Sequence, residues 1–394
     1  MTSSYQYQSL SSPTTEIRLL DLLPGRGTIE CRLRITDLAL AKDTYEPISY
    51  CWKSYSRKGW PICTYREKKE VKNYILVRVD GFGFHITKSL AAALRQMRLT
   101  SEVRVLWADA ICINQADDVE KSAQVAMMGT IFQSGKQTLA WLGDADCWTG
   151  RAFRALKIHL GQIPEHSNST GLYQDSGDES QYRLGDPGAE LLHSGYLRRA
   201  RELCQDILSF LSFRSILQRP YFERAWIVQE IVLSENVLVM CGKHRITGDE
   251  LYNGLLGYKH RRAIPNRAAL IGNSIEDLWD NLGRYCLDEI INKLLHTKAS
   301  DPRDKLYSAL GLHQNCPECG LMVVDYSKDV DEVFLEATKL LLSRSPFLNL
   351  LSMSYCTSRP DGARKVRFAL PKAGILNLNS KVDGLDYLGM SSIR

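Results

Sequence analysis

The acidic residue Glu230 is the side chain of this sequence that is best placed to do chemistry. In the stretch "RAWIVQE" it follows Trp226 by four residues and Ile227 by three, so on a helix the three side chains share one side. A carboxyl among apolar neighbours has a raised pKa, which suits general acid or base work. The alternative is a structural Glu230 that pairs with Arg219, Arg224 or a backbone amide.

A second group of polar side chains lies in the stretch "LWADAICINQADDVEK", residues 106–121. Asp109 ends an apolar run that is typical of a strand buried on both faces, and Asn114 and Gln115 follow in the loop. Ligands of open α/β sheets bind at the carboxyl ends of strands, so these side chains could bind ribose hydroxyls or an amide. Equally, Asp109 could cap a turn while the two amides satisfy loop backbone groups.

Two arginines, Arg219 and Arg224, flank the start of the predicted Glu230 helix and could clamp a pyrophosphate near its positive end. The favoured alternative is a salt-bridge network with Glu223 and Asp304. At the end of "YEPISYCW", residues 45–52, aromatic stacking on a base is conceivable, but core packing is the simpler interpretation.

No metal or bound cofactor is expected. The spacing His313-x-x-Cys316-x-x-Cys319 is partly that of zinc ligands, but the sequence offers no evident fourth ligand. The G-x-G-x-x-G, P-loop and H-E-x-x-H signatures are missing from the sequence.

Bulk composition excludes several classes of protein. The 394 residues carry a net charge of only +5, without a block of Lys and Arg, so neither nucleic acid nor a membrane is expected as a partner. Eleven cysteines at irregular spacing and an N-terminus without a leader pattern predict free thiols in the cytoplasm. No run approaches the roughly 18 apolar residues of a membrane span.

The elements that must position the polar groups read as strand, helix, strand. Residues 103–110 and "TLAWLGDAD" (138–146) are predicted strands ending in an acid, and between them Asp117 and Glu120 form a capping box for a helix. Pro220 suits the first turn of the Glu230 helix. A βαβ unit is therefore expected.

Further turn and cap signals flank this unit. Asp80-Gly81 predicts a hairpin turn in "YILVRVDGFGFHIT", and "TKSLAAALRQMR" is predicted to be a helix. Thr247-x-x-Glu250 predicts a helix cap, and "DPRDKLYSALGL" predicts a helix from Asp301 that stops at Gly311. The predicted organisation is a loose segment (1–15), a core (16–260) with an inserted polar loop (161–188), a mainly helical extension packed on the core (261–355) and a poorly defined tail (356–394).

Six ordered motifs across residues 16–312 resemble the fungal heterokaryon incompatibility (HET) domain. They are "IRLLDLLPG", "YEPISYCW", "LWADAICINQADDVEKSAQVAMMGTIF", "AWLGDAD", "RPYFERAWIVQE" and "DPRDKLYSALGL". The sequence departs from the family's pattern at Trp52-Lys53, where the family has Trp-Gly, and in its tail, which lacks a late aromatic segment, so truncation is conceivable.

The resemblance implies a fold class of α/β, with a parallel-sheet core like that of TIR domains and flavodoxin, elaborated with extra helices and a small β-hairpin. It implies a role in fungal non-self recognition and programmed cell death. "RAWIVQE" resembles the TIR segment that carries a catalytic glutamate, and several TIR domains hydrolyse NAD. On this basis Glu230 is the expected catalytic residue of an NAD glycohydrolase. The expected nucleotide-binding residues are Asp109, Asn114, Gln115, Trp226, Arg219 and Arg224.

Two alternatives remain open. The domain could be a non-enzymatic assembly module that forms a homo-oligomer or binds other incompatibility proteins. It could also be a diverged paralogue without a role in incompatibility, because fold does not imply function.

Overall fold

The computed structural model describes residues 5–53, 74–159, 211–212, 214–260, 267–294, 296–313 and 322–342, with the backbone alone at 158–159, 255–260, 267–273, 341–342 and in five short strands. The predicted inserted loop 161–188 and the pair Cys316 and Cys319 lie outside the described residues.

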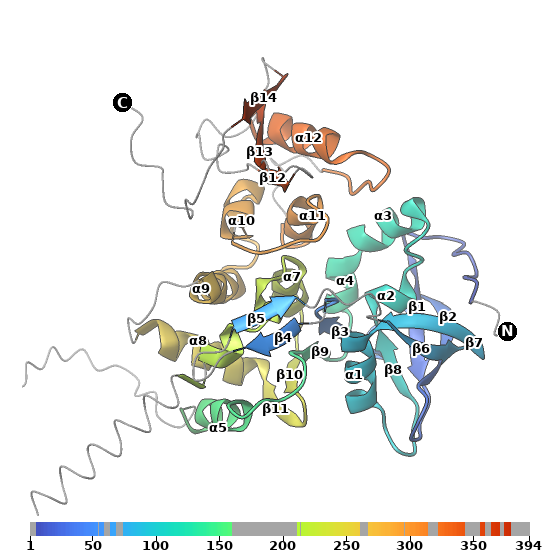
Figure 1. The fold of residues 1–394 in the computed structure, drawn as a ribbon. Coiled ribbons are helices and arrows are strands. Elements are labelled where there is room, and N and C mark those ends of the chain that lie inside the picture. The colour runs from blue at the N-terminus through green and yellow to red at the C-terminus, as the bar shows by residue number, and fades with distance from the viewer. Residues whose placement is uncertain are drawn as a thin grey trace, which may run out of the picture.

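One nine-stranded mixed sheet runs through the molecule in the order β11-β10-β9-β3-β8-β1-β2-β6-β7 (Figure 1). Helices are packed against it, so the chain has an α/β fold. The strands are β1 (Glu16–Leu22), β2 (Glu30–Asp37), β3 (Glu46–Tyr50), β6 (Tyr74–Val79), β7 (Phe82–Thr87), β8 (Arg104–Trp107), β9 (Thr138–Trp141), β10 (Val237–Cys241) and β11 (His244–Thr247).

The centre of the sheet is parallel: β3 pairs in parallel with β8 on one side and β9 on the other, and β10 pairs in parallel with β9. Numbered in chain order, these four strands lie in the order 2-1-3-4, which is how the flavodoxin-like order begins. Strands β1, β2, β6 and β7 extend the sheet beyond β8, and β11 extends it beyond β10 in antiparallel fashion.

The predicted βαβ unit differs from expectation in its detail. Strand β3 lies between β8 and β9, and the connection carries three helices, α2 (Asp109–Cys112), α3 (Asp118–Ala126) and α4 (Met128–Gln133). The expected strand 103–110 ends at Trp107, because Asp109 already begins α2.

Local signals set several element ends. The helix predicted in "TKSLAAALRQMR" is α1 (Lys88–Met97), and the side chain of Thr87 caps it. Asp80 and Gly81 both have positive φ in the β6–β7 turn. Thr247 and Glu250 exchange hydrogen bonds at the start of α8 (Gly248–His260), forming the reciprocal cap.

Two helix starts depart from prediction. The stretch from Pro220 forms a 3-10 helix, η1 (Pro220–Glu223), and the chain is extended at Arg224 before α7 (Trp226–Val232) begins. The helix of "DPRDKLYSALGL", α11 (Asp304–Leu310), begins three residues after Asp301, whose carboxylate instead accepts the backbone N–H of Arg303. Both differences leave Arg224 and Asp304 at element boundaries, where their side chains can face a cleft.

The remaining elements surround this core. Helix α7 packs on β3 and β9, and the helices of the C-terminal part contact its outer side (Figure 1). The remaining elements are α5 (Thr149–His159), α9 (Arg267–Asp280), α10 (Leu287–Leu294), α12 (Val330–Leu342), the hairpin β4 (Tyr55–Lys58) and β5 (Thr64–Glu67), and the small sheet β12 (Tyr355–Ser358), β13 (Arg364–Leu370) and β14 (Gly374–Asn379). Among the described helices, none has both the length and the apolar character that a bilayer crossing requires.

Candidate functional site

A cleft of about 800 Å³ lies at the carboxyl ends of the parallel strands β3 and β8. Its lining comes from the residues after β3, from α2, α3 and α4, from η1 and the start of α7, and from the segment before α11. The lining residues are Cys51, Trp52, Lys53, Asp109, Ile113, Gln115, Lys121, Val125, Met128, Gln218, Pro220, Glu223, Arg224, Trp226, Lys298, Ala299, Ser300, Asp301, Asp304 and Tyr326.

Asp109, two residues after the end of β8, places its carboxyl group in the cleft lining. The indole N–H of Trp52 donates to its Oδ2 at 2.8 Å, and the backbone N–H of Ala110 donates to its Oδ1 at 2.8 Å. Burial raises the pKa of Asp109, although Arg224 and the Trp52 hydrogen bond act in the opposite direction. Trp52 is 38% exposed and lies beside a carboxyl group that is costly to ionise.

Arg224 lies between two carboxyl groups. Its guanidinium is 3.7 Å from Glu230 Oε2, donates to the carbonyl of Tyr50, and is close enough to Asp109 for the two charges to interact. Arg224 lines the cleft, whereas Glu230, its ion-pair partner, does not.

Glu230 is buried, at 2% exposure, on the inner side of α7. It accepts a hydrogen bond from the Ser49 hydroxyl of β3, and Ser49 is in turn hydrogen-bonded to the Tyr221 hydroxyl at 2.6 Å. Burial raises the pKa of Glu230 to about 7, while Arg224 and the Ser49 hydrogen bond lower it and Asp109 raises it. The predicted apolar surroundings and raised pKa are therefore present, together with an arginine partner.

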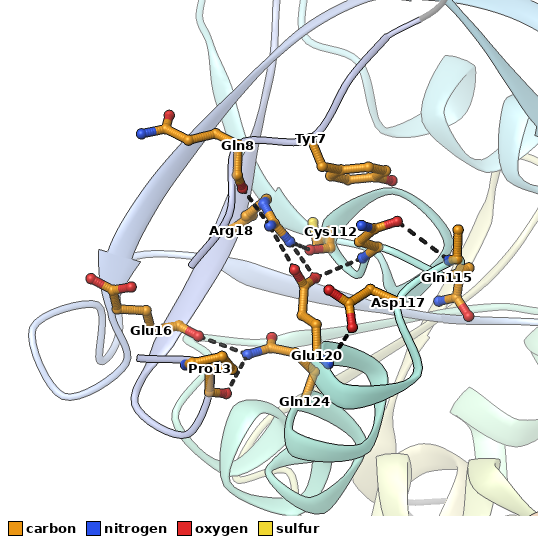
Figure 2. A network of polar contacts seen from close by, with 12 residues as sticks. Tyr7, Gln8, Pro13, Glu16, Arg18, Cys112, Gln115, Asp117, Glu120 and Gln124 are labelled. Atoms are coloured by element: carbon orange, nitrogen blue, oxygen red, sulfur yellow. Dashed lines mark hydrogen bonds and ion pairs between the residues drawn. The ribbon is translucent and has the colours of Figure 1, made fainter. Parts of the chain in front are cut away.

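A buried ion pair holds the segment between α2 and α3 that carries Gln115 (Figure 2). Arg18 on β1 donates to both carboxylate oxygens of Glu120 at 2.5 and 2.8 Å, and also to the carbonyls of Gln8 and Cys112. Glu120 accepts the backbone N–H of Asn114 at 2.8 Å. The predicted capping box is thus only half formed: Asp117 caps α3, but the Glu120 side chain braces the loop instead.

The N-terminal segment takes part in the same brace. The Tyr7 hydroxyl donates to the carbonyl of Ile111 at 2.9 Å, and the Gln124 amide donates to the carbonyls of Pro13 and Glu16 (Figure 2). Residues 5–15, which belong to the segment predicted to be loose, thereby contact the loop that forms one cleft wall.

The cleft brings together four of the predicted site residues: Asp109, Gln115, Arg224 and Trp226. Asn114 does not line it, because its side-chain oxygen accepts the backbone N–H of Ala116 within the loop. The amide of Gln115 donates to the carbonyl of Asp109 at 3.0 Å and so closes the turn after α2.

Arg219 lies outside the cleft lining, at the end of β9. Its guanidinium donates to the carbonyls of Leu142 and Asp144, to Asp146 Oδ2 at 3.1 Å and to the Thr149 hydroxyl. These contacts make a buried network, but the acid in it is Asp146 rather than the predicted Glu223 or Asp304.

Sequence reasoning did not assign several cleft residues to the site, and the signals for them were present. Trp52 ends the "YEPISYCW" motif, whose Ser49 and Tyr50 are buried as expected while Trp52 itself is part-exposed. Asp301 and Asp304 belong to the "DPRD" motif, which we read as a helix start. In the described part of the chain, no group of three His, Cys, Asp or Glu side chains could hold a metal ion.

Comparison with known proteins adds a family context to this geometry. Residues 45–230 match the family described as heterokaryon incompatibility protein (HET). The chain is also 26% identical to heterokaryon incompatibility protein 6, OR allele, of Neurospora crassa, in an alignment that covers 87% of this chain and 54% of that protein. The chain thus spans about half the length of this curated relative. No solved structure matches the chain significantly.

Proposed function

The chain is a fungal HET-domain protein, and on this premise we propose that it acts in heterokaryon incompatibility, where it contributes to cell death after fusion of unlike hyphae. The match over residues 45–230 and the similarity to a Neurospora incompatibility protein support this role. Most of the residues that line the cleft lie within the matched region.

The chemistry we propose for the cleft is hydrolysis of the bond between nicotinamide and ribose in NAD. The observation that supports it most directly is the set of groups in one cleft: a carboxyl at a strand end (Asp109), a guanidinium (Arg224) and two indoles (Trp52 and Trp226). Aromatic faces suit planar rings, and the guanidinium suits a pyrophosphate.

In this reaction nicotinamide leaves with the bonding electron pair, and the ribose carbon becomes a cation that a neighbouring carboxylate stabilises. Water then adds to that carbon and loses a proton, which gives ADP-ribose, nicotinamide and H⁺. Asp109 lines the cleft and can face the cation directly. Glu230, the residue expected to be catalytic, reaches the ligand only if the guanidinium of Arg224 moves aside.

A second candidate function is that of a non-enzymatic assembly module, which binds another copy or another incompatibility protein. The contacts of Glu230 favour it, because a carboxylate held by Ser49 and Arg224 inside the fold has the partners of a structural group.

The two candidates differ in what purified protein does with NAD. The enzyme proposal expects nicotinamide release that falls at least about a hundredfold in Asp109→Asn, in line with the loss of one transition-state contact. Release should also fall in Glu230→Ala, which removes the carboxylate that pairs with Arg224. Asp43→Asn is the matched control, because Asp43 is exposed, has φ 60 and lies outside the cleft lining.

Induced expression of the same variants in a filamentous fungus completes the test. Growth arrest that persists in Asp109→Asn, with no nicotinamide release from the unsubstituted protein, would remove the enzyme proposal and favour the assembly module. Growth arrest that is lost together with nicotinamide release would support the enzyme.

A further inference from the structure

Part of the cleft lining comes from residues beyond the family match at residues 45–230. Six lining residues lie beyond the match: five between Lys298 and Asp304, in the segment that leads into α11, and Tyr326. The segment is fixed to the domain through its backbone: the N–H of Ala225 donates to the Lys298 carbonyl at 2.9 Å, and the N–H of Lys298 donates to the Glu223 carbonyl. The segment at Lys298 is therefore a fixed part of the cleft.

The "DPRD" motif has an internal order that leaves Asp304 facing the cleft. Asp301 is occupied by the guanidinium of Arg303, at 2.6 Å, and that guanidinium also donates to the carbonyls of Tyr326 and Lys328. Asp304 has no such cationic partner among the ion pairs of the described residues.

Asp304 is held in place by an aromatic residue. The Tyr326 hydroxyl donates to its Oδ1 at 2.6 Å, and Trp226 lines the same cleft. Tyr326 itself is fixed between two cations, with Lys121 Nζ 3.8 Å and Arg303 Cζ 5.0 Å from its ring centroid. Asp304 is thus a positioned carboxyl group rather than a mobile surface one.

Two carboxyl groups and two indoles therefore line one cleft: Asp109, which accepts the indole N–H of Trp52, together with Asp304 and Trp226. A carboxylate accepts hydrogen bonds from two hydroxyls at once, which is how Asp or Glu side chains hold a ribose in dinucleotide-binding folds. An indole face packs on the apolar side of a sugar ring. Lys298 and Arg224 also line the cleft and can neutralise phosphate.

We propose that Asp304, which lines the same cleft as Asp109, binds the ribose hydroxyls of the nucleotide. This inference rests on the nucleotide-binding function proposed above. It gives the "DPRD" motif a role in ligand recognition, in addition to its role as the start of α11.

The test is the affinity of the full chain for ADP-ribose, followed by titration calorimetry. Asp304→Asn keeps an oxygen that can accept the Tyr326 hydroxyl, so the variant should fold, but it loses the charge and one acceptor. We expect its affinity for ADP-ribose to fall about tenfold or more, because hydrogen bonds to charged groups are the strong ones. Asp43→Asn, which removes one exposed carboxylate outside the cleft lining, should bind as the unsubstituted chain does.

Tyr326→Phe provides a second variant, which keeps the ring between Lys121 and Arg303 and removes the hydroxyl that orients Asp304. It should lose affinity severalfold, and it decides the question if Asp304→Asn does not fold. If the unsubstituted chain binds ADP-ribose and both variants bind it equally well, the role of Asp304 is overturned while the nucleotide-binding function stands. If the unsubstituted chain binds neither ADP-ribose nor NAD, the nucleotide-binding function and the inference fall together.

Discussion

The buried carboxyl of Glu230 leads to a specific prediction about the pH dependence of stability. Its pKa is raised from 4.5 to about 7 in the folded chain, mainly by burial. Between these two values the folded state holds a proton that the unfolded state has released. The contribution of this group to stability is therefore complete below pH 4.5 and is lost as the pH rises through about 7.

The magnitude follows from the size of the shift. A rise from 4.5 to about 7, at roughly 1.4 kcal/mol for each pH unit, amounts to about 3 kcal/mol of stability lost across the window. Glu230→Gln removes the titration and keeps an oxygen that can accept the Ser49 hydroxyl. The variant leaves Arg224 without a carboxylate partner. Because glutamine does not titrate, this cost to the variant is the same at every pH and does not contribute to the pH dependence.

The assay is urea unfolding of both proteins at pH 4.5, 6 and 8, followed by tryptophan fluorescence. Other titrating groups cancel in the difference between the two proteins. We expect the free energy of unfolding of the unsubstituted chain to fall by about 3 kcal/mol more than that of the variant between pH 4.5 and 8. A difference that stays constant over this range would show that Glu230 does not titrate in it, and would refute burial as the dominant influence on its pKa.

Three further predictions concern stability and can be measured by urea unfolding. Replacing Arg18 by Met, or Glu120 by Leu, should cost about 3–5 kcal/mol of stability, because each change leaves an unpaired buried charge. The double variant should be less destabilised than either single variant. A double variant that is more destabilised than both would contradict this. Gly135→Ala should destabilise the fold by about 1–3 kcal/mol, because the added Cβ would lie 2.4 Å from Cδ of Pro47 in β3. An unchanged midpoint of urea unfolding would show that β3 can shift to make room for the methyl group. Thr247→Ser should retain the cap of α8 that Thr247→Ala loses at a cost of about 1 kcal/mol, and equal stabilities of the two would rule out the cap.

Local patterns were sufficient where the physical cause is local. The hairpin at Asp80-Gly81 and the reciprocal cap of Thr247 and Glu250 depend on residues close in sequence, and both are confirmed. The α/β class is also confirmed, because apolar runs separated by amphipathic helices leave few ways to bury both faces of a sheet.

Predictions failed where a distant residue competes for a side chain. Glu120 was expected to complete a capping box with Asp117, but Arg18, 102 residues away in sequence, takes its carboxylate. A charge-assisted, bidentate pair in a buried place is stronger than a single hydrogen bond to a backbone amide. The expected single helix from Pro220 is interrupted at Arg224, whose extended backbone lets its guanidinium reach the Tyr50 carbonyl of β3.

The sequence by itself determined the residue types of the candidate site and the family to which they point. Glu230 and Asp109 could be named because a carboxyl near apolar residues and polar groups at strand ends are local chemical signals, and the resemblance to TIR domains added Trp226 to the set. Only the tertiary structure decided which of them meet. Packing of α7 on β3 buries Glu230 behind Arg224, and the segment before α11 brings Asp304 into the same cleft as Asp109, 195 positions earlier by the numbering. Side-chain burial and opposition across a cleft depend on how elements far apart in sequence pack, and no local pattern encodes that.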